Sequence, residues 1–211
     1  MSTKSTDESS RRVTATRGDY GDPATRARIL EAAWRLVEEG AEASMGAVAR
    51  RAGVSRQAVY LHVGDRTGLL VALVDHMDRS LGLEERGREV FAAPSAVDGI
   101  ERLLGMLAVA HEGIAPVARI LEAARRTDPD AEAAWADRMG RRRAGSRHLV
   151  ERLAAEGGLA ADWDVESAAA LLYAFTLPAM WDALVVEQGW TAEQYRDRLT
   201  AALKSALVRG A

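Results

Sequence analysis

The stretch from Ser44 to Leu70 constrains the fold more than any other part of the chain, because it predicts two short helices joined by a tight turn. Ser44 and Ser55 each stand where a helix begins and can accept a hydrogen bond from the free N–H groups of its first turn. Gly53 follows the first helix, and a glycine there can adopt a left-handed conformation that turns the chain sharply. Small and branched apolar residues recur at helical spacing on the inner faces: Val48, Ala49, Ala52, Val59 and Val63. The pattern therefore predicts two helices that cross closely.

The outer face of the second predicted helix carries side chains that suit nucleic acid. A guanidinium, an amide, a phenol and an imidazole can bond base edges and phosphates. Between Ser44 and Arg66 the basic residues are four arginines, and the one acid is Asp65. An ordinary helical hairpin with a solvated polar face has the same spacing, but the local excess of positive charge favours contact with DNA.

Charge is distributed unevenly along the 211 residues, whose formal net charge is −3. Residues 1–66 hold 11 basic and 9 acidic side chains, a net of +2, and residues 67–211 hold 17 and 22, a net of −5. A basic head on an acidic body is typical of a DNA-binding domain joined to a separate regulatory domain. The abundance of Ala, Leu, Arg and Glu predicts mainly helix.

Several classes of protein are not indicated. Cysteine is absent, which excludes disulfides and thiolate metal sites and fits a reducing cytoplasm. No apolar run reaches the roughly eighteen residues of a membrane helix, and the N-terminus has no apolar signal core, so we expect a cytoplasmic protein without a membrane segment. No phosphate loop, nucleophile motif or carboxylate–histidine cluster is present, so we expect neither enzymatic activity nor a cofactor. His76 and His111 are isolated, and no metal site is predicted.

Four short motifs follow one another from Thr25 to Leu70. The run T-R-x-x-I-L-x-A-A-x-x-L ends before Gly40, V-A-x-x-A-G-V-S comes next, and V-Y-x-H-V and D-R-T-G-L-L complete the series. This succession closely resembles the tetracycline-repressor (TetR) family of bacterial transcription regulators. The resemblance implies an all-α fold, with a three-helix helix-turn-helix DNA-binding head followed by a larger helical ligand-binding and dimerisation domain.

The resemblance also implies which residues contact DNA. Side chains at the start of the second helix would meet bases in the major groove, and the polar groups around them would bond phosphates. The expected DNA-binding residues are Thr25, Ser44, Arg56, Gln57, Ala58, Tyr60, Leu61, His62 and Arg66. Side-chain geometry alone also allows Arg56 to pair with guanine and Gln57 with adenine, each worth about 1–3 kcal/mol of discrimination. Leu61 either touches a thymine methyl group or shields the turn.

Composition divides the chain into three parts. Residues 1–22 are polar and predicted to be a disordered arm; Arg11, Arg12 and Arg17 could touch DNA, although a solvated tail is favoured. Residues 23–67 form the predicted DNA-binding domain, and residues 68–211 the body. A long helix from Arg66 to about Ala93 is expected to act as a lever between them. The helices expected after it are residues 95–113, 116–128, 129–158, 164–189 with a kink at Pro178, and 191–210.

Methionines and aromatic residues in the body suggest an adaptable apolar ligand site between the lever helix and the helices after it. The candidate lining residues are Met77, Leu81, Met106, Leu107, His111, Ile120, Trp135, Met139, Tyr173 and Trp181. Each could instead be plain core. The run Arg141–Arg143 is interpreted as a solvated helix face, because acids flank it.

The last two predicted helices carry enough apolar surface to pair with a second copy as a four-helix bundle. The candidate dimer residues are Leu171, Leu172, Phe175, Leu184, Tyr195, Leu199, Leu203 and Leu207. The alternative is that these helices pack only on their own body.

These observations predict a repressor that binds a palindromic DNA operator as a homodimer and is released by a small-molecule ligand. Two alternatives stay open. One is an activator, or a regulator controlled by a protein partner. The other is a helical small-molecule-binding module that does not bind DNA.

Overall fold

The protein is all-helical, as predicted. A computed structural model describes residues 22–210, and in that range it contains no β-strand, only an isolated bridge between Leu159 and Val208. The predicted polar arm, with Arg11, Arg12 and Arg17, lies outside the described residues apart from Asp22. The helices are α1 (Pro23–Glu38), α2 (Met45–Ala52), α3 (Arg56–Val63), α4 (Arg66–Ser80), α5 (Leu83–Phe91), α6 (Ala96–Ala124), α7 (Pro129–Ala155), α8 (Val165–Phe175), α9 (Pro178–Trp181), the π-helical segment η1 (Asp182–Glu187) and α10 (Ala192–Leu207).

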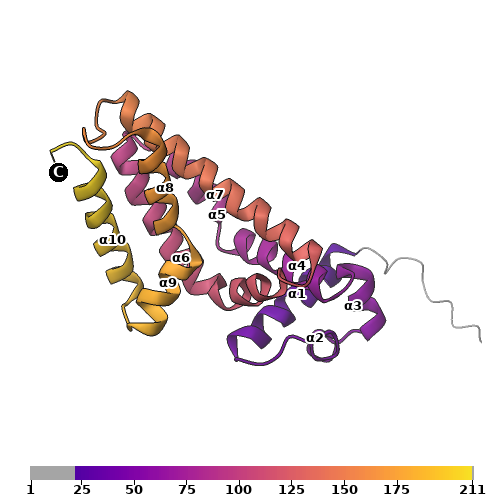
Figure 1. Ribbon diagram of the computed structural model, residues 1–211. Helices are drawn as coiled ribbons and strands as arrows, with labels where there is room; N and C mark the ends of the chain where they lie inside the picture. Colours follow the sequence, from indigo (N-terminus) through magenta and orange to yellow (C-terminus); the bar gives the residue numbers. More distant parts are fainter. Residues whose placement is uncertain (1–21, 211) are drawn as a thin grey trace, which may run out of the picture.

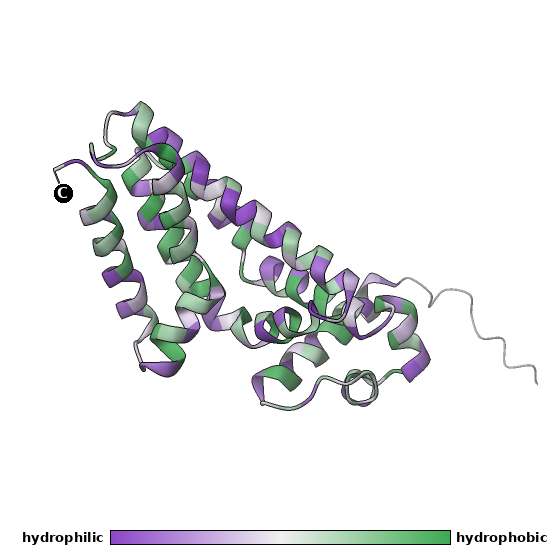
Figure 2. Cartoon of the chain, in the orientation of Figure 1, coloured by the Kyte–Doolittle hydropathy of each residue, from purple (hydrophilic) through white to green (hydrophobic). Residues whose placement is uncertain are grey.

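Helices α1, α2 and α3 gather at one end of the molecule, and α8 and α10 lie at the other (Figure 1). The long helices α6 and α7 run between the two ends. Figure 2 shows many hydrophilic residues along α7 and many hydrophobic residues in the helices packed beside it. This arrangement separates the candidate DNA-contacting helices from the candidate dimer helices.

Two apolar cores hold the molecule together. The first joins α1–α4 to the C-terminal half of α6 and the start of α7, through residues such as Leu73, Val117 and Trp135. The second joins α5, the N-terminal half of α6 and the end of α7 to α8 and α10, through residues such as Leu104 and Leu203. Because α6 and α7 contribute to both cores, the first core crosses the predicted domain boundary at residue 67. The head is therefore packed directly against the body.

The expected lever helix ends earlier than predicted. It was predicted to continue to about Ala93, but α4 ends at Ser80 and α5 begins at Leu83. Gly82 separates them with φ = 63°, a left-handed conformation that favours glycine and interrupts a right-handed helix. The lever is therefore the short helix α4, and α5 is a separate element.

Pro116 does not begin a new helix, contrary to the prediction. It lies inside α6, which runs unbroken from Ala96 to Ala124. A proline there removes one backbone hydrogen bond and costs about 3 kcal/mol. Its neighbours Ala115 and Val117 are buried in the two cores, and the burial of residues along this helix offsets that cost.

The predicted kink at Pro178 is a break. Helix α8 ends at Phe175, and the segment Pro178–Glu187 continues at an angle of 55° to it. The proline stands in the first turn of α9, where its missing N–H needs no partner.

The sequence analysis found no apolar run as long as a membrane helix, but helix α6 is long and apolar enough to qualify. It has an 18-residue window with a mean hydropathy of 1.4, which reaches the length and composition of a membrane span. Half of that window is buried inside the molecule, where it contributes to both cores. We therefore interpret α6 as a helix of the protein core.

Candidate nucleic-acid interface and body pocket

The turn between α2 and α3 is built as predicted. The Ser44 hydroxyl accepts a hydrogen bond from the Ala47 N–H at 3.3 Å, and the Ser55 hydroxyl accepts one from the Ala58 N–H at 3.0 Å. Gly53 ends α2 with φ = 68°, in the left-handed region. These caps start both helices at defined residues and so determine which side of α3 faces solvent.

The outward face of α3 presents a paired arginine and tyrosine. The Arg56 guanidinium donates to the Tyr60 hydroxyl at 3.2 Å and lies 5.6 Å from the centre of its ring. Tyr60 is 42% exposed and Leu61 is 54% exposed, although both are large apolar residues, and Gln57 is also exposed. A helix that leaves such side chains in water has a surface suited to a partner.

The remaining expected contact residues differ in accessibility. Ala58 and His62 on α3 are half-buried, and so is Ser44, the residue that caps α2. Thr25 is a correction, because it is only 6% exposed and its hydroxyl donates to Asp22 at 2.9 Å. The same Asp22 carboxylate accepts from the Thr25 N–H, so it occupies the helix N-terminus where a phosphate was expected.

Arg66 begins α4 at the edge of this surface. It is exposed, and its guanidinium forms a 2.9 Å ion pair with Glu42, which precedes α2. Side chains of both residues remain largely in solvent, so the ion pair contributes little stability and can exchange for another anion. Arg66 is therefore available to a phosphate.

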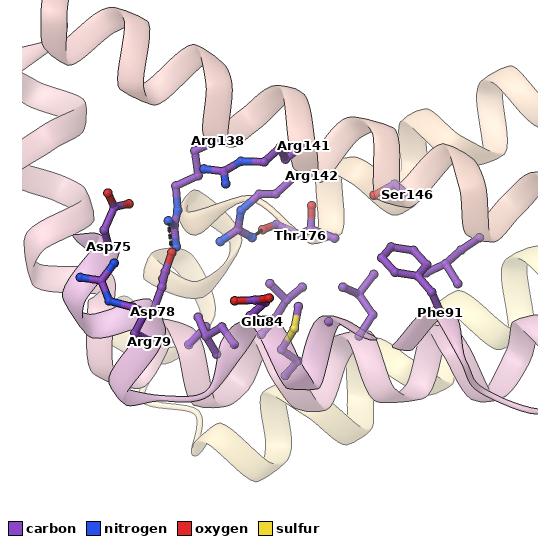
Figure 3. A pocket seen from close by; sticks show the side chains of 18 residues that line it. Asp75, Asp78, Arg79, Glu84, Phe91, Arg138, Arg141, Arg142, Ser146 and Thr176 are labelled. Atoms are coloured by element: carbon purple, nitrogen blue, oxygen red, sulfur yellow. Dashed lines mark hydrogen bonds and ion pairs between the residues drawn. The ribbon is translucent and has the colours of Figure 1, made fainter. Parts of the chain in front are cut away.

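A pocket of about 540 Å³ lies in the body between α4, α5, α6 and α7; we call it the body pocket. Figure 3 shows Arg138 and Arg142 extending from α7 on one side, with Glu84 and Phe91 on the opposite side. Apolar side chains cover much of the remaining wall, namely Leu83, Leu103, Met106, Leu107 and Leu149. The pocket combines an apolar surface with a cationic side.

A family model matches the N-terminal domain. Residues 29–73 match the model of the bacterial regulatory proteins of the tetR family. This N-terminal domain belongs to the TetR family. The matched residues cover most of α1, all of α2 and α3, and the first half of α4. A comparison with curated protein sequences found no match.

Solved structures of TetR-family regulators share the fold over most of their length. A putative transcriptional regulator from Saccharomonospora viridis, in complex with choline, superposes with a TM-score of 0.71 at 18% identity, covering 88% of this chain and 98% of that one. A TetR-family regulator from Pectobacterium atrosepticum gives 0.59 at 26% identity, covering 90% and 94%. SmeT, the repressor of a Stenotrophomonas maltophilia multidrug efflux pump, gives 0.63 at 21% identity, covering 89% and 92%.

The body pocket uses few of the residues expected to line it. Met106 and Leu107 do line it. The other candidates are absent from its wall: Met77, Leu81, His111, Ile120, Trp135, Met139, Tyr173 and Trp181. Met77, Trp135 and Met139 belong to the first core, and His111 is buried against the rings of Trp181 and Tyr195.

The arginines of the body pocket were missed because α7 was taken to expose its whole basic run. Arg141 and Arg143 are exposed as expected, but Arg142 is half-buried on the pocket wall. The spacing of Arg138, Arg142 and Ser146 at four-residue intervals was a signal that these side chains share one helix face.

Most of the candidate dimer residues are buried inside the protomer, which is a second correction. Leu172, Tyr195, Leu199, Leu203 and Leu207 are at most 6% exposed and belong to the second core. Their periodicity reflected packing on the chain's own body, the alternative left open. Leu171, Phe175 and Leu184 are half-exposed and stay candidates.

Proposed function

We propose that the protein is a cytoplasmic transcriptional repressor that binds a palindromic operator as a homodimer and leaves it when a small molecule occupies the body pocket. The exposed Arg56–Tyr60 pair on α3, inside a TetR-family DNA-binding domain, carries the proposal. Arg56, Gln57 and Ala58 would meet base edges, and Leu61 a thymine methyl group. Ser44, Tyr60, His62 and Arg66 would bond phosphates, which orient the head without reading sequence.

Two observations on similar proteins favour repression and ligand control. SmeT and NalD, the latter from Pseudomonas aeruginosa, are described as repressors of multidrug efflux pumps. The Saccharomonospora viridis regulator holds choline, and FadR from Bacillus subtilis holds stearoyl-CoA. A palindromic operator would place two heads about 34–36 Å apart, or a multiple of that spacing.

Helix α4 connects the two functions. It begins at Arg66 beside α3 and lines the body pocket further along, with Asp75, Asp78 and Arg79. A ligand that displaces α4 would therefore move the DNA contacts at its start. Coupling between two such sites is typically about 1–3 kcal/mol, enough to change operator occupancy severalfold or more.

A homodimer would form through the outward faces of α8 and α10. The half-exposed Leu171 and Phe175 on α8 offer apolar surface there, and Ala201 and Ala202 on α10 are small, exposed residues that allow a close approach. Sedimentation of the purified chain at micromolar concentration tests this: a dimer is expected, and replacement of Leu171 and Ala202 by glutamate should dissociate it.

Gel-shift titration with DNA from upstream of the coding region tests the recognition surface. Arg56→Ala should relax base preference at one position by about 1–3 kcal/mol, and Tyr60→Phe should weaken binding to all sequences alike. Arg88→Ala, an exposed arginine on α5 away from α3 and the proposed dimer faces, is the matched control and should bind as wild type does. Unchanged binding by both α3 variants would contradict the assignment. Affinity that does not fall as salt rises would contradict DNA binding through phosphates.

A further inference from the structure

The Arg142 guanidinium lacks an acidic partner among residues 22–210. Its one hydrogen bond is from Nη1 to the backbone carbonyl of Thr176, the residue that caps the C-terminus of α8. Burial, followed by repulsion from Arg138, lowers the pKa of Arg142 to about 10, so the side chain keeps its charge at neutral pH. A half-buried cation without an anion is unfavourable, and a bound anion would relieve that cost.

The other charged side chains of the body pocket are paired or face solvent. Arg138 donates to both oxygens of Asp78, at 2.6 and 2.9 Å. Arg141 is exposed and pairs with Asp137 at 3.0 Å. Asp75 and Arg79 are exposed, and the Glu84 side chain is 84% exposed. The inner part of the pocket therefore carries the uncompensated positive charge of Arg142.

Ser146 supplies a second unsatisfied polar group on the same wall. Its residue is 1% exposed, and its hydroxyl has no hydrogen-bond partner within the described residues. It follows Arg142 by one turn of α7, and both residues line the pocket. A guanidinium and a hydroxyl on one helix face are donors that a carboxylate can accept from.

The rest of the pocket wall is apolar, and the cavity is larger than a small inorganic anion would fill. Phe91 and Met106 line the pocket from α5 and α6, and Leu149 continues the wall of α7 beyond Ser146. A volume of about 540 Å³ is within the range of drug-sized ligands. A ligand that suits both the polar groups of Arg142 and Ser146 and the apolar wall has one anionic end and an apolar remainder.

We propose that the body pocket binds an amphipathic carboxylate, whose oxygens accept hydrogen bonds from Arg142 and Ser146 while its apolar part lies against Phe91, Met106 and Leu149. The inference rests on the proposed function, in which this pocket is the ligand site, and it specifies the chemistry of the ligand. Neutral analogues would bind more weakly because they leave the guanidinium without an anion.

Isothermal titration calorimetry of the full-length protein tests the proposal with four probes: decanoate, 4-phenylbutyrate and the primary amide of each. At least one carboxylate should bind, and about tenfold or more tightly than its amide. Arg142→Gln should lose that preference, so that acid and amide bind alike. Ser146→Ala should reduce it partly. Arg143→Gln, one residue away but exposed and outside the pocket wall, is the matched control and should keep the wild-type preference.

A purely structural role for Arg142, as a cap of α8, predicts a different result. Arg142→Gln would then lower the melting temperature and leave the ratio of acid to amide affinity unchanged, which overturns the proposal. Arg142→Lys keeps the charge and should restore part of the preference. Failure of both carboxylates to bind the wild-type protein, or equal binding of acid and amide, also overturns it.

Operator binding separates this inference from the proposed function. If a carboxylate binds through Arg142 but does not change the gel shift, release of DNA by the ligand is contradicted. The proposed carboxylate site is then still supported. The protein could instead bind its operator while neither carboxylate binds the protein or changes the gel shift. That result would contradict the carboxylate site but not DNA recognition.

Discussion

Arg138 in α7 donates two hydrogen bonds to the carboxylate of Asp78 in α4, at 2.6 and 2.9 Å. At the other end of α4, the Thr67 hydroxyl donates to Asp128, the residue that caps the start of α7. Polar contacts near both ends thus attach α4, which begins with the expected phosphate contact, to the helix that carries the arginines of the body pocket. Movement of α7 relative to the head would therefore move α4 with it.

Asp78→Asn should lower the free energy of unfolding by about 1–3 kcal/mol, because a charge-assisted pair is lost and Arg138 is left without its anion. The side chains of Arg138 and Asp78 are 15% and 27% exposed, so water only partly replaces the contact. Urea unfolding followed by circular dichroism measures the change. Asp137→Asn breaks the Arg141–Asp137 pair, whose side chains are 69% and 67% exposed, and should cost under about 0.5 kcal/mol. Equal losses in the two variants would contradict this.

Gly68→Ala should destabilise the head. A Cβ at residue 68 would lie 2.0 Å from the carbonyl oxygen of Val63, and a backbone atom at the end of α3 has little freedom to move away. The expected loss is about 1–3 kcal/mol, together with weaker operator binding, because α3 must shift against α4. Gly46→Ala is the control within the same domain, since its Cβ meets only the end of Arg50 at 3.7 Å. That variant should be as stable as wild type or more stable, as alanine favours helix.

The stability of the protein should fall as the pH drops below about 6.5, in part because of His111. Burial, and then the charges of Arg142 and Arg138, lower the pKa of this imidazole from 6.5 to about 3. The unfolded chain takes up a proton near pH 6.5 and the folded chain does not, so this stabilisation is complete above pH 6.5 and decreases between pH 6.5 and 3. The slope is up to about 1.4 kcal/mol per pH unit.

His111→Leu should remove that part of the slope, because leucine fills the site between Trp181 and Tyr195 without titrating. It also removes two ring nitrogens that have no hydrogen-bond partner among the described residues. Urea unfolding at pH 7.5, 6.0 and 5.0 gives the difference between variant and wild type. A difference that does not change with pH would contradict the assignment.

Glu42→Gln should strengthen operator binding severalfold. It releases Arg66 from their 2.9 Å ion pair and removes a negative charge beside the expected path of the phosphates. Gel-shift titration at several salt concentrations measures this effect. Arg66→Gln should have the opposite effect and reduce the salt slope by about one unit. Glu193→Gln, on α10, changes the net charge equally and should leave operator affinity unchanged.

Local signals in the sequence were sufficient to predict the helices of the head. The hydroxyls of Ser44 and Ser55, and the left-handed conformation open to Gly53, act within a few residues of their own position. Such interactions depend on the order of residues alone, and α2 and α3 begin where they were predicted. The exposed position of Arg56 and Tyr60 follows from the same caps, because they determine which side of α3 faces the core.

The packing of the helices in the body depends on interactions between residues that are distant in the sequence. Apolar periodicity shows that a face is buried, but not what buries it, so Tyr195 and Leu203 were assigned to a partner chain although α10 packs on its own protomer. Pro116 stays within α6 because two cores stabilise that helix from either end.

By itself, the sequence determined an all-helical chain with an N-terminal helix-turn-helix head, because helix caps, turns and periodicity are local. Only the tertiary structure decided that Arg142 is half-buried in the pocket wall while Arg143 faces solvent outside it. Neighbouring arginines have the same local propensity, and their environments differ only through the helices α4, α5 and α6 that pack against one side of α7.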